Sequence, residues 1–149
     1  MTQTRRIATF NLGNLARAGA PVYETVPRTR AEYDQKTKFL QDLFARMDAD
    51  IVGVQEVFHY ESLLDSAQAM YTSEQIFAPL PEGVTEESAR SPRVGILSRL
   101  PIAGKPKVHR RFARPHGVLG LELSEFRRPV LEARFELWEG LVVTVFVAH

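Results

Sequence analysis

The sequence predicts an α/β or α+β domain in which helices cover at least one β-sheet. Its 149 residues, 44% of them hydrophobic, correspond to one ordinary domain with a single sizeable core. Short β-like apolar runs alternate with longer segments whose apolar residues repeat with the helical period. The sequence has no internal repeat and no low-complexity tract, which argues against solenoid and propeller folds.

Composition excludes several classes of protein. The chain has no cysteine, so disulfides, thiolate metal sites and a cysteine nucleophile are excluded. The formal net charge of +1 argues against binding to nucleic acid through bulk electrostatics. No apolar run approaches the roughly 18–20 residues of a membrane span. No secretory signal is visible, and a cytoplasmic location is expected.

The first half predicts a strand, a loop and a helix in that order. Residues 6–12 form a short β-like run, and the glycine and prolines of residues 16–28 indicate a loop. Thr29, with Glu32 three residues later, fits a capping box at the start of a helix. The apolar stripe expected on the buried face of this helix is Phe39, Leu40, Leu43, Phe44 and Met47.

The elements that follow are shorter. Residues 51–55 are almost wholly apolar and predict a strand buried on both faces. The further expected elements are a helix over 60–70, strands over 75–78 and 93–97, a mobile surface loop over 79–92, and a weaker strand over 108–112.

A β-hairpin is predicted at the end of the chain. Its strands are 129–138 and 141–149, joined by a turn at Glu139 and Gly140. The second strand is apolar on both faces and therefore needs cover on both sides. We expect the sheet that should pack over it to be missing, leaving an exposed face and an open edge.

Two polar residues stand at the ends of the two most convincing strands. Asn11 ends the first strand, and Glu56 directly follows the strand at 51–55. Sites in open α/β sheets form where strands end, and an amide and a carboxylate oxygen there suit Mg²⁺ or Mn²⁺. Taken alone, an asparagine after a strand is more often a turn former, and a glutamate there is more often solvated.

Histidine supplies a third candidate. His149 closes the most apolar strand and is suited to hydrogen bonding a phosphate oxygen or to acid–base chemistry near neutral pH. It is also typical of an ordinary polar strand end. The other histidines, His59, His109 and His116, lie at a helix start or in loops and are expected at the surface.

Five segments occur in the same order and spacing as in a known family. They are RIATFNLGNL, DADIVGVQEVF, RVGILSRLPI, RRPVLEARF and VVTVFVAH. Together they resemble the endonuclease/exonuclease/phosphatase superfamily, the deoxyribonuclease-like metal-dependent phosphoesterases. The aspartate-rich lead into an apolar strand that ends in Gln55-Glu56-Val57 is the most specific piece.

The resemblance implies a fold, a reaction and roles for particular residues. It implies a four-layer αββα sandwich, of which this chain supplies about the first half as one sheet with covering helices. It implies hydrolysis of a phosphate ester with Mg²⁺ or Mn²⁺ as cofactor. By family role Glu56 is the principal metal carboxylate, Asn11 the neighbouring amide ligand, and His149 the histidine that contacts the scissile phosphate. Arg99 resembles a substrate-side arginine, and Arg93 is a weaker candidate for substrate binding.

The chain also departs from the family. Other members are longer, and their second half supplies an Asp-x-Asn pair, a further aspartate and a terminal Ser/Asp-His pair. No aspartate follows Asp65 in this sequence, so none of these can be assigned. The expectation is that residues 1–149 are the N-terminal part of one domain, truncated after His149. The missing half is then expected from the same polypeptide or from a partner chain.

Three functions remain open at this point. The first is a nuclease-like phosphodiesterase acting on a phosphate-ester substrate, possibly nucleic acid. The second is a phosphomonoesterase or phospholipid-directed phosphatase, and the third is a non-catalytic binding remnant of the fold. A cluster of basic residues could follow a polyanion or be a solvated face, and comprises Lys105, Lys107, Arg110, Arg111 and Arg114. Arg127 and Arg128 precede the hairpin and could approach the edge of the substrate, but salt bridges at the rim are the favoured expectation.

Overall fold

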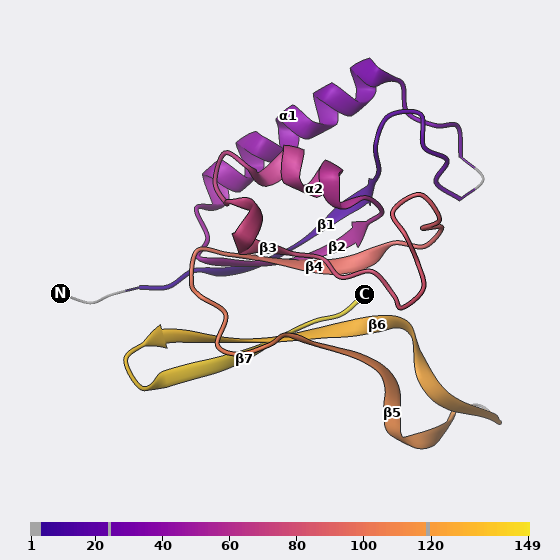
Figure 1. The fold of residues 1–149 in the computed structure, drawn as a ribbon, viewed down its shortest axis with the longest axis vertical. Coiled ribbons are helices and arrows are strands. Elements are labelled where there is room, and N and C mark those ends of the chain that lie inside the picture. The colour runs from indigo at the N-terminus through magenta and orange to yellow at the C-terminus, as the bar shows by residue number, and fades with distance from the viewer. Residues whose placement is uncertain (1–3, 24, 119) are drawn as a thin grey trace.

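In the computed structural model, two helices, a first sheet and a second sheet lie in successive layers (Figure 1). The structure describes residues 4–23, 25–118 and 120–149. This arrangement confirms the α+β sandwich that the sequence predicts. It differs in one respect, because the described chain holds strands of two sheets rather than of one.

The elements follow one another in the predicted order. They are β1 (Ile7–Leu15), α1 (Arg30–Met47), β2 (Ile51–Val57), α2 (Tyr60–Ala67), the 3-10 helix η1 (Ser73–Gln75), β3 (Ile76–Phe77), β4 (Arg93–Ser98), β5 (Lys107–Val118), β6 (Leu121–Trp138) and β7 (Leu141–Val147).

The first sheet has the strand order β1-β2-β4-β3. β1 and β2 are parallel, with Asn11 paired to Gln55, so both strands end at the same edge of the sheet. β4 runs antiparallel to β2, and its last residue, Ser98, pairs with Ile51 at the start of β2. Residues that follow β4 therefore lie at the opposite edge from those that follow β1 and β2.

Helix α1 begins with the predicted capping box. The Thr29 hydroxyl accepts from the backbone N–H of Glu32, and the Glu32 carboxylate accepts from the backbone N–H of Thr29. The buried face differs slightly from the predicted stripe, because Phe39 is 59% exposed. The residues that α1 buries are Tyr33, Thr37, Leu40 and Phe44.

Two hydrophobic cores separate the layers. One lies between the helices and the first sheet and includes Leu40, Phe44 and Leu63. The other lies between the two sheets and includes Ile51, Ile96 and Phe135. β2 contributes to both cores, which confirms that it is a strand buried on both faces.

The second sheet, β5-β6-β7, is larger than the sequence predicts. β5 runs to Val118, and β6 begins at Leu121 rather than at Pro129. The outer parts of both strands carry mostly exposed residues and so lack a clear apolar alternation. The pairing of β5 with β6 also breaks register on either side of Arg111, opposite the stretch that contains Pro129, which has no N–H for a ladder bond.

Strand β7 is covered on one face only. The prediction that no sheet packs over it was wrong for the inner face, because Val147 is buried against the first sheet at Gly53. The outer face stays open, and Phe146 is 62% exposed there, with Leu141 and Val142 also exposed. Within the described part of the chain, no helix is both long and apolar enough to span a membrane.

Candidate functional site

The structure brings Asn11, Glu56 and His149 together. Nε2 of His149 lies 3.2 Å from Oε1 of Glu56 and 3.4 Å from Nδ2 of Asn11. The first two residues meet because β1 and β2 are parallel neighbours. His149 joins them because the buried end of β7 packs on the first sheet at Val147, two residues earlier. Residues far apart in the sequence therefore form one cluster, as expected for a site at the end of parallel strands.

Glu56 owes its orientation to an unusual backbone conformation. Its φ is +62°, in the left-handed region that few residues other than glycine adopt. The pairing of β2 with β4 loses register between Val54 and Val57, so Glu56 lies in a bulge. Its Oε2 accepts a 2.8 Å hydrogen bond from the backbone N–H of Asn14. The conformation costs on the order of 1 kcal/mol, and such strain is often found at functional sites.

Two cations hold the end of β1 in place. Arg28 donates from Nη1 to the carbonyl oxygen of Asn14 at 2.7 Å, and Lys36 donates to that of Gly13. On the other side of this segment, the N–H of Gly13 donates to Oδ1 of Asn11 at 2.8 Å. Burial, together with the nearby charge of Arg28, lowers the pKa of Lys36 to about 8, although Glu56 opposes the shift. These contacts fix the positions of Asn11 and Glu56.

Arg128 orients the imidazole of His149. Its Nη1 contacts both ring nitrogens of His149, and its Nη2 donates to the hydroxyl of Tyr23 at 3.2 Å. The side-chain amide of Asn11 and Oε1 of Glu56 both face Nε2 of His149, so a donor and an acceptor meet at this nitrogen. Tyr23 is held in turn by an edge-on contact with Phe58.

The donor set fits a hard divalent cation in kind. Glu56 offers a carboxylate oxygen and Asn11 an amide oxygen, and Mg²⁺ commonly takes one or two carboxylates and fills its shell with water and phosphate. Among the described residues, no group of three or more histidine or acidic side chains could hold a metal. The chain therefore presents part of a ligand set.

Arg99 lies away from this cluster, so its expected place beside the substrate is not what the structure shows. It follows β4 and lies at the opposite edge of the first sheet, where Nη1 donates to Oδ1 of Asp48 at 2.8 Å. This contact holds the pKa of the Asp48 carboxyl below its ordinary value. The guanidinium also lies 5.6 Å from the ring centre of Tyr71. Arg99 thus ties together the far edge of the sheet.

Arg93 lies at the same edge of the sheet as Glu56 but is turned toward the loop over 79–92. Its side chain is 6% exposed and forms an ion pair with Glu86. Glu86 also accepts from the backbone N–H of Tyr60, so the pair fastens the loop to α2. The structure shows no contact between Arg93 and the Asn11 cluster, and substrate binding by Arg93 stays a prediction.

The histidine predictions had mixed outcomes. His59 was expected at the surface, but it is buried; its Nδ1 accepts from the backbone N–H of Arg17, and burial lowers its pKa. His109 is partly exposed and contacts Glu132. The side chain of His116 lies outside the described residues.

Sequence reasoning missed Arg28, Lys36 and Tyr23, and it expected Arg128 in a rim salt bridge. A cation that binds a backbone carbonyl leaves no signature in a sequence. The sequence signal for Arg128 was the segment Arg127-Arg128-Pro129 at the start of the predicted hairpin. The role of Arg128 depends on where β6 lies relative to His149, and only the fold gives that position.

Comparison with known proteins identifies the family and the fold. The family model described as "Endonuclease/Exonuclease/phosphatase family" matches residues 8–135. A solved structure, an endonuclease/exonuclease/phosphatase family protein from Leptotrichia buccalis C-1013-b, matches with a TM-score of 0.56 and 14% identity. The match covers 98% of this chain and 53% of that one, so this chain spans about half of its length. No curated protein matches. The chain belongs to the endonuclease/exonuclease/phosphatase family.

Proposed function

We propose that this chain carries part of the active site of a divalent-metal-dependent phosphoesterase, acting as a nuclease-like phosphodiesterase. The observation that carries the proposal is the convergence of Glu56 and Asn11 on His149, each within 3.4 Å of its Nε2. Membership of the family supports a phosphoesterase or nuclease-like protein in general terms. The kind of substrate and the dependence on a divalent metal go beyond family membership and are proposed here.

Each residue has a role that follows from its contacts. Glu56 and Asn11 would hold Mg²⁺ or Mn²⁺, which neutralises phosphate oxygens and lowers the barrier to attack by water. His149 would donate a ring N–H to a phosphate oxygen. Arg128, whose guanidinium contacts the imidazole, would hold His149 in position. No covalent intermediate on the protein is required.

The proposal also covers the other ligands of the metal ion. One carboxylate and one amide leave most of an octahedral shell to be filled. Water and the substrate phosphate supply some positions. We propose that further residues come from outside these 149, as the remaining part of a single domain on the same polypeptide or as a partner chain. The location of the protein in the cell stays a prediction from its sequence.

Two other functions stay in view. A phosphomonoesterase or phospholipid-directed phosphatase would use the same three residues and differ in the substrate that fits. A non-catalytic binding module is favoured by one observation, namely that no cluster of three or more metal-binding side chains occurs among the described residues.

The test is hydrolysis of bis(p-nitrophenyl) phosphate and p-nitrophenyl phosphate in the presence of Mn²⁺, by the complete protein that includes the further residues proposed above. Glu56→Gln removes the carboxylate charge and keeps the shape of the side chain. We expect it to lower the rate by roughly 100-fold, or about 3 kcal/mol. The matched control is Glu74→Gln, an exposed glutamate away from the cluster, which should keep the rate.

The outcomes separate the three functions. A Glu56→Gln rate equal to that of the control would contradict the proposed metal site. Faster turnover of the monoester than of the diester would select the phosphomonoesterase. Absence of Mn²⁺-dependent turnover of either ester by that complete protein, without any substitution, would favour the binding module.

A further inference from the structure

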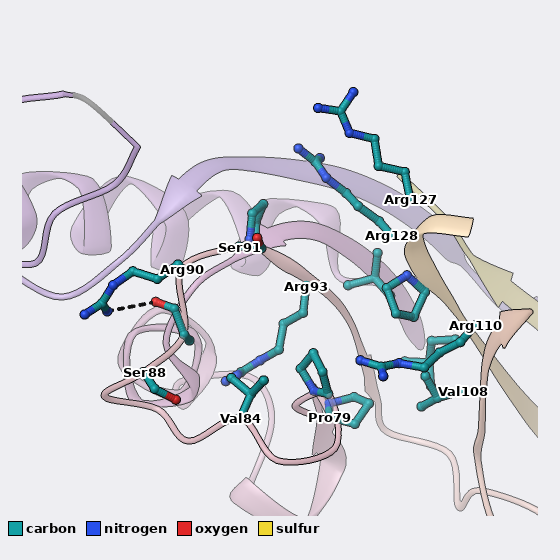
Figure 2. Close-up of a pocket in the computed structure, with 16 residues that line it drawn as sticks. Pro79, Val84, Ser88, Arg90, Ser91, Arg93, Val108, Arg110, Arg127 and Arg128 are labelled. Atoms are coloured by element: carbon teal, nitrogen blue, oxygen red, sulfur yellow. Dashed lines mark hydrogen bonds between the residues drawn. The ribbon is translucent and has the colours of Figure 1, made fainter. Parts of the chain in front are cut away.

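A cavity of about 390 Å³ lies between the loop over 79–92, the start of β4, and strands β5 and β6. Figure 2 shows the residues that line it. Five of them are arginines, and none of the described lining residues carries a carboxylate. The arginines are Arg90, Arg93, Arg110, Arg127 and Arg128. A hollow with this excess of positive charge attracts anions.

Arg93 is the buried member of this group. Its side chain is 6% exposed, and the ion pair with Glu86 uses Nη2. Its Nε and Nη1 are buried and have no hydrogen-bond partner in the described structure. Buried donors are almost always paired, and an unpaired pair of guanidinium donors beside a cavity indicates a missing water or anion.

Two further arginines of the cavity are free of ion pairs. Among the described residues, neither Arg110 nor Arg127 has a salt-bridge or hydrogen-bond partner, and both are exposed. Figure 2 shows the guanidinium of Arg110 reaching across the cavity toward Pro79. Arg127 and Arg128 are turned to the side away from Pro79.

Arg128 connects this cavity with the candidate active site. It lines the cavity, and its guanidinium also contacts His149. An anion in the cavity and a phosphate at His149 would thus lie on either side of one arginine.

We propose that this arginine cavity binds a second phosphate group of the substrate, adjacent to the one that is cleaved. The inference rests on the proposed phosphoester hydrolysis and extends it to a substrate with two neighbouring phosphates. Arg93 supplies two donors without a partner, on a side chain held by Glu86, and Arg110 supplies an exposed guanidinium. Charge-assisted hydrogen bonds from guanidinium to phosphate are among the strong ones.

Two classes of compound carry such a pair of phosphates, namely nucleotides and phosphorylated inositols. The test measures binding in EDTA, so that it does not depend on metal or on turnover. The probes are thymidine 5′-monophosphate, thymidine 3′,5′-bisphosphate and inositol 1,4-bisphosphate. We expect the unaltered protein to bind at least one bisphosphate about tenfold more tightly than the monophosphate.

Arg110→Gln should reduce this preference to about twofold or less, because it removes one cavity donor from an exposed position. Arg111→Gln is the matched control, since Arg111 is the next residue on β5, is exposed and does not line the cavity. The preference should survive in that variant. Arginine Nε–H resonances in NMR give a second readout, and that of Arg93 should shift on titration with the preferred bisphosphate.

The results overturn the proposal in two ways. Equal affinity for mono- and bisphosphates in the unaltered protein would show that the cavity holds no second phosphate. An equal loss of preference in the Arg110 and Arg111 variants would show a diffuse electrostatic effect instead. Loss of hydrolysis in Glu56→Gln with the bisphosphate preference intact would support both proposals independently, and an intact preference with no metal-dependent activity would overturn the proposed hydrolysis alone.

Discussion

The two sheets differ in how they are covered, and each contributes different chemistry to the site. The first sheet has helices on one face and the second sheet on the other, and its central strand β2 is buried along most of its length. The second sheet has an inner face in the core and a bare outer face. The first sheet supplies Asn11 and Glu56, and the second supplies Arg127 and Arg128 together with the approach to His149.

This difference suggests that the first sheet positions the metal ligands and the second sheet supplies phosphate-binding arginines. Metal ligands must be held within narrow limits, and β2, which is buried on both faces, provides that rigidity for Glu56. Phosphate-binding arginines tolerate more variation, because long side chains adjust to the anion. The strained backbone of Glu56 persists because the surrounding first sheet is well packed.

The largest expected effect is a loss of stability. It is measured by comparing substitutions on the two faces of the second sheet. Phe135→Ala removes a ring that is fully buried between the sheets and should lower the free energy of unfolding by about 3–5 kcal/mol. Phe146→Ala removes a ring that is 62% exposed on the outer face and should lower it by less than about 1 kcal/mol. Urea unfolding measures both, and similar values would mean that the outer face is covered in solution.

The contact between the sheets gives the second prediction. A Cβ at position 53 would lie 3.0 Å from Cγ2 of Val147, so Gly53→Ala should lower the free energy of unfolding by about 1–3 kcal/mol. It should also shift the NMR signals of His149, which lies two residues beyond Val147. The control is Gly117→Ala, since nothing lies within 4 Å of a Cβ there. We expect that control to change stability by no more than about 1 kcal/mol. Unchanged His149 signals in Gly53→Ala would show that the end of β7 is not placed by this contact.

Lys36 gives the smallest expected effect. Its pKa is lowered to about 8 in the fold, so the unfolded chain binds more protons above that pH. Stability should therefore rise as the pH increases from about 8 toward 10, as the buried charge is lost. The gain attributable to Lys36 is roughly 1 kcal/mol after allowance for solvent screening. Thermal unfolding at pH 8 and pH 9.5 should show this rise, and Lys36→Met should lack it; an equal rise in the variant would assign it to other groups.

Much of the first sheet could be predicted from the sequence. Strands β1, β2 and β4 stand out as apolar runs, and the Thr29 and Glu32 capping box marks the start of α1. The cluster of Asn11, Glu56 and His149 follows from strand ends and from the family resemblance. Local patterns suffice here because buried strands and helix caps depend on neighbouring residues.

Other features depend on the direction and pairing of strands. The family resemblance suggested Arg99 as a substrate-side arginine, but β4 is antiparallel to β2, so Arg99 lies at the edge of the sheet opposite Glu56. The left-handed backbone of Glu56 and the contact of Arg128 with His149 require long-range packing. The outer halves of β5 and β6 were missed because most of their side chains are exposed.

The central claim is that Asn11 and Glu56 hold one divalent metal ion. Titration with Mn²⁺, followed by paramagnetic broadening of NMR signals, tests this claim most directly. Bound Mn²⁺ should first broaden the side-chain amide of Asn11 and the backbone N–H of Asn14, which donates to Glu56. In Glu56→Gln these signals should stay sharp at the same Mn²⁺ concentration. Early broadening near Asp48 and Asp50 at the opposite edge of the sheet, with Asn11 and Asn14 unaffected, would contradict the site.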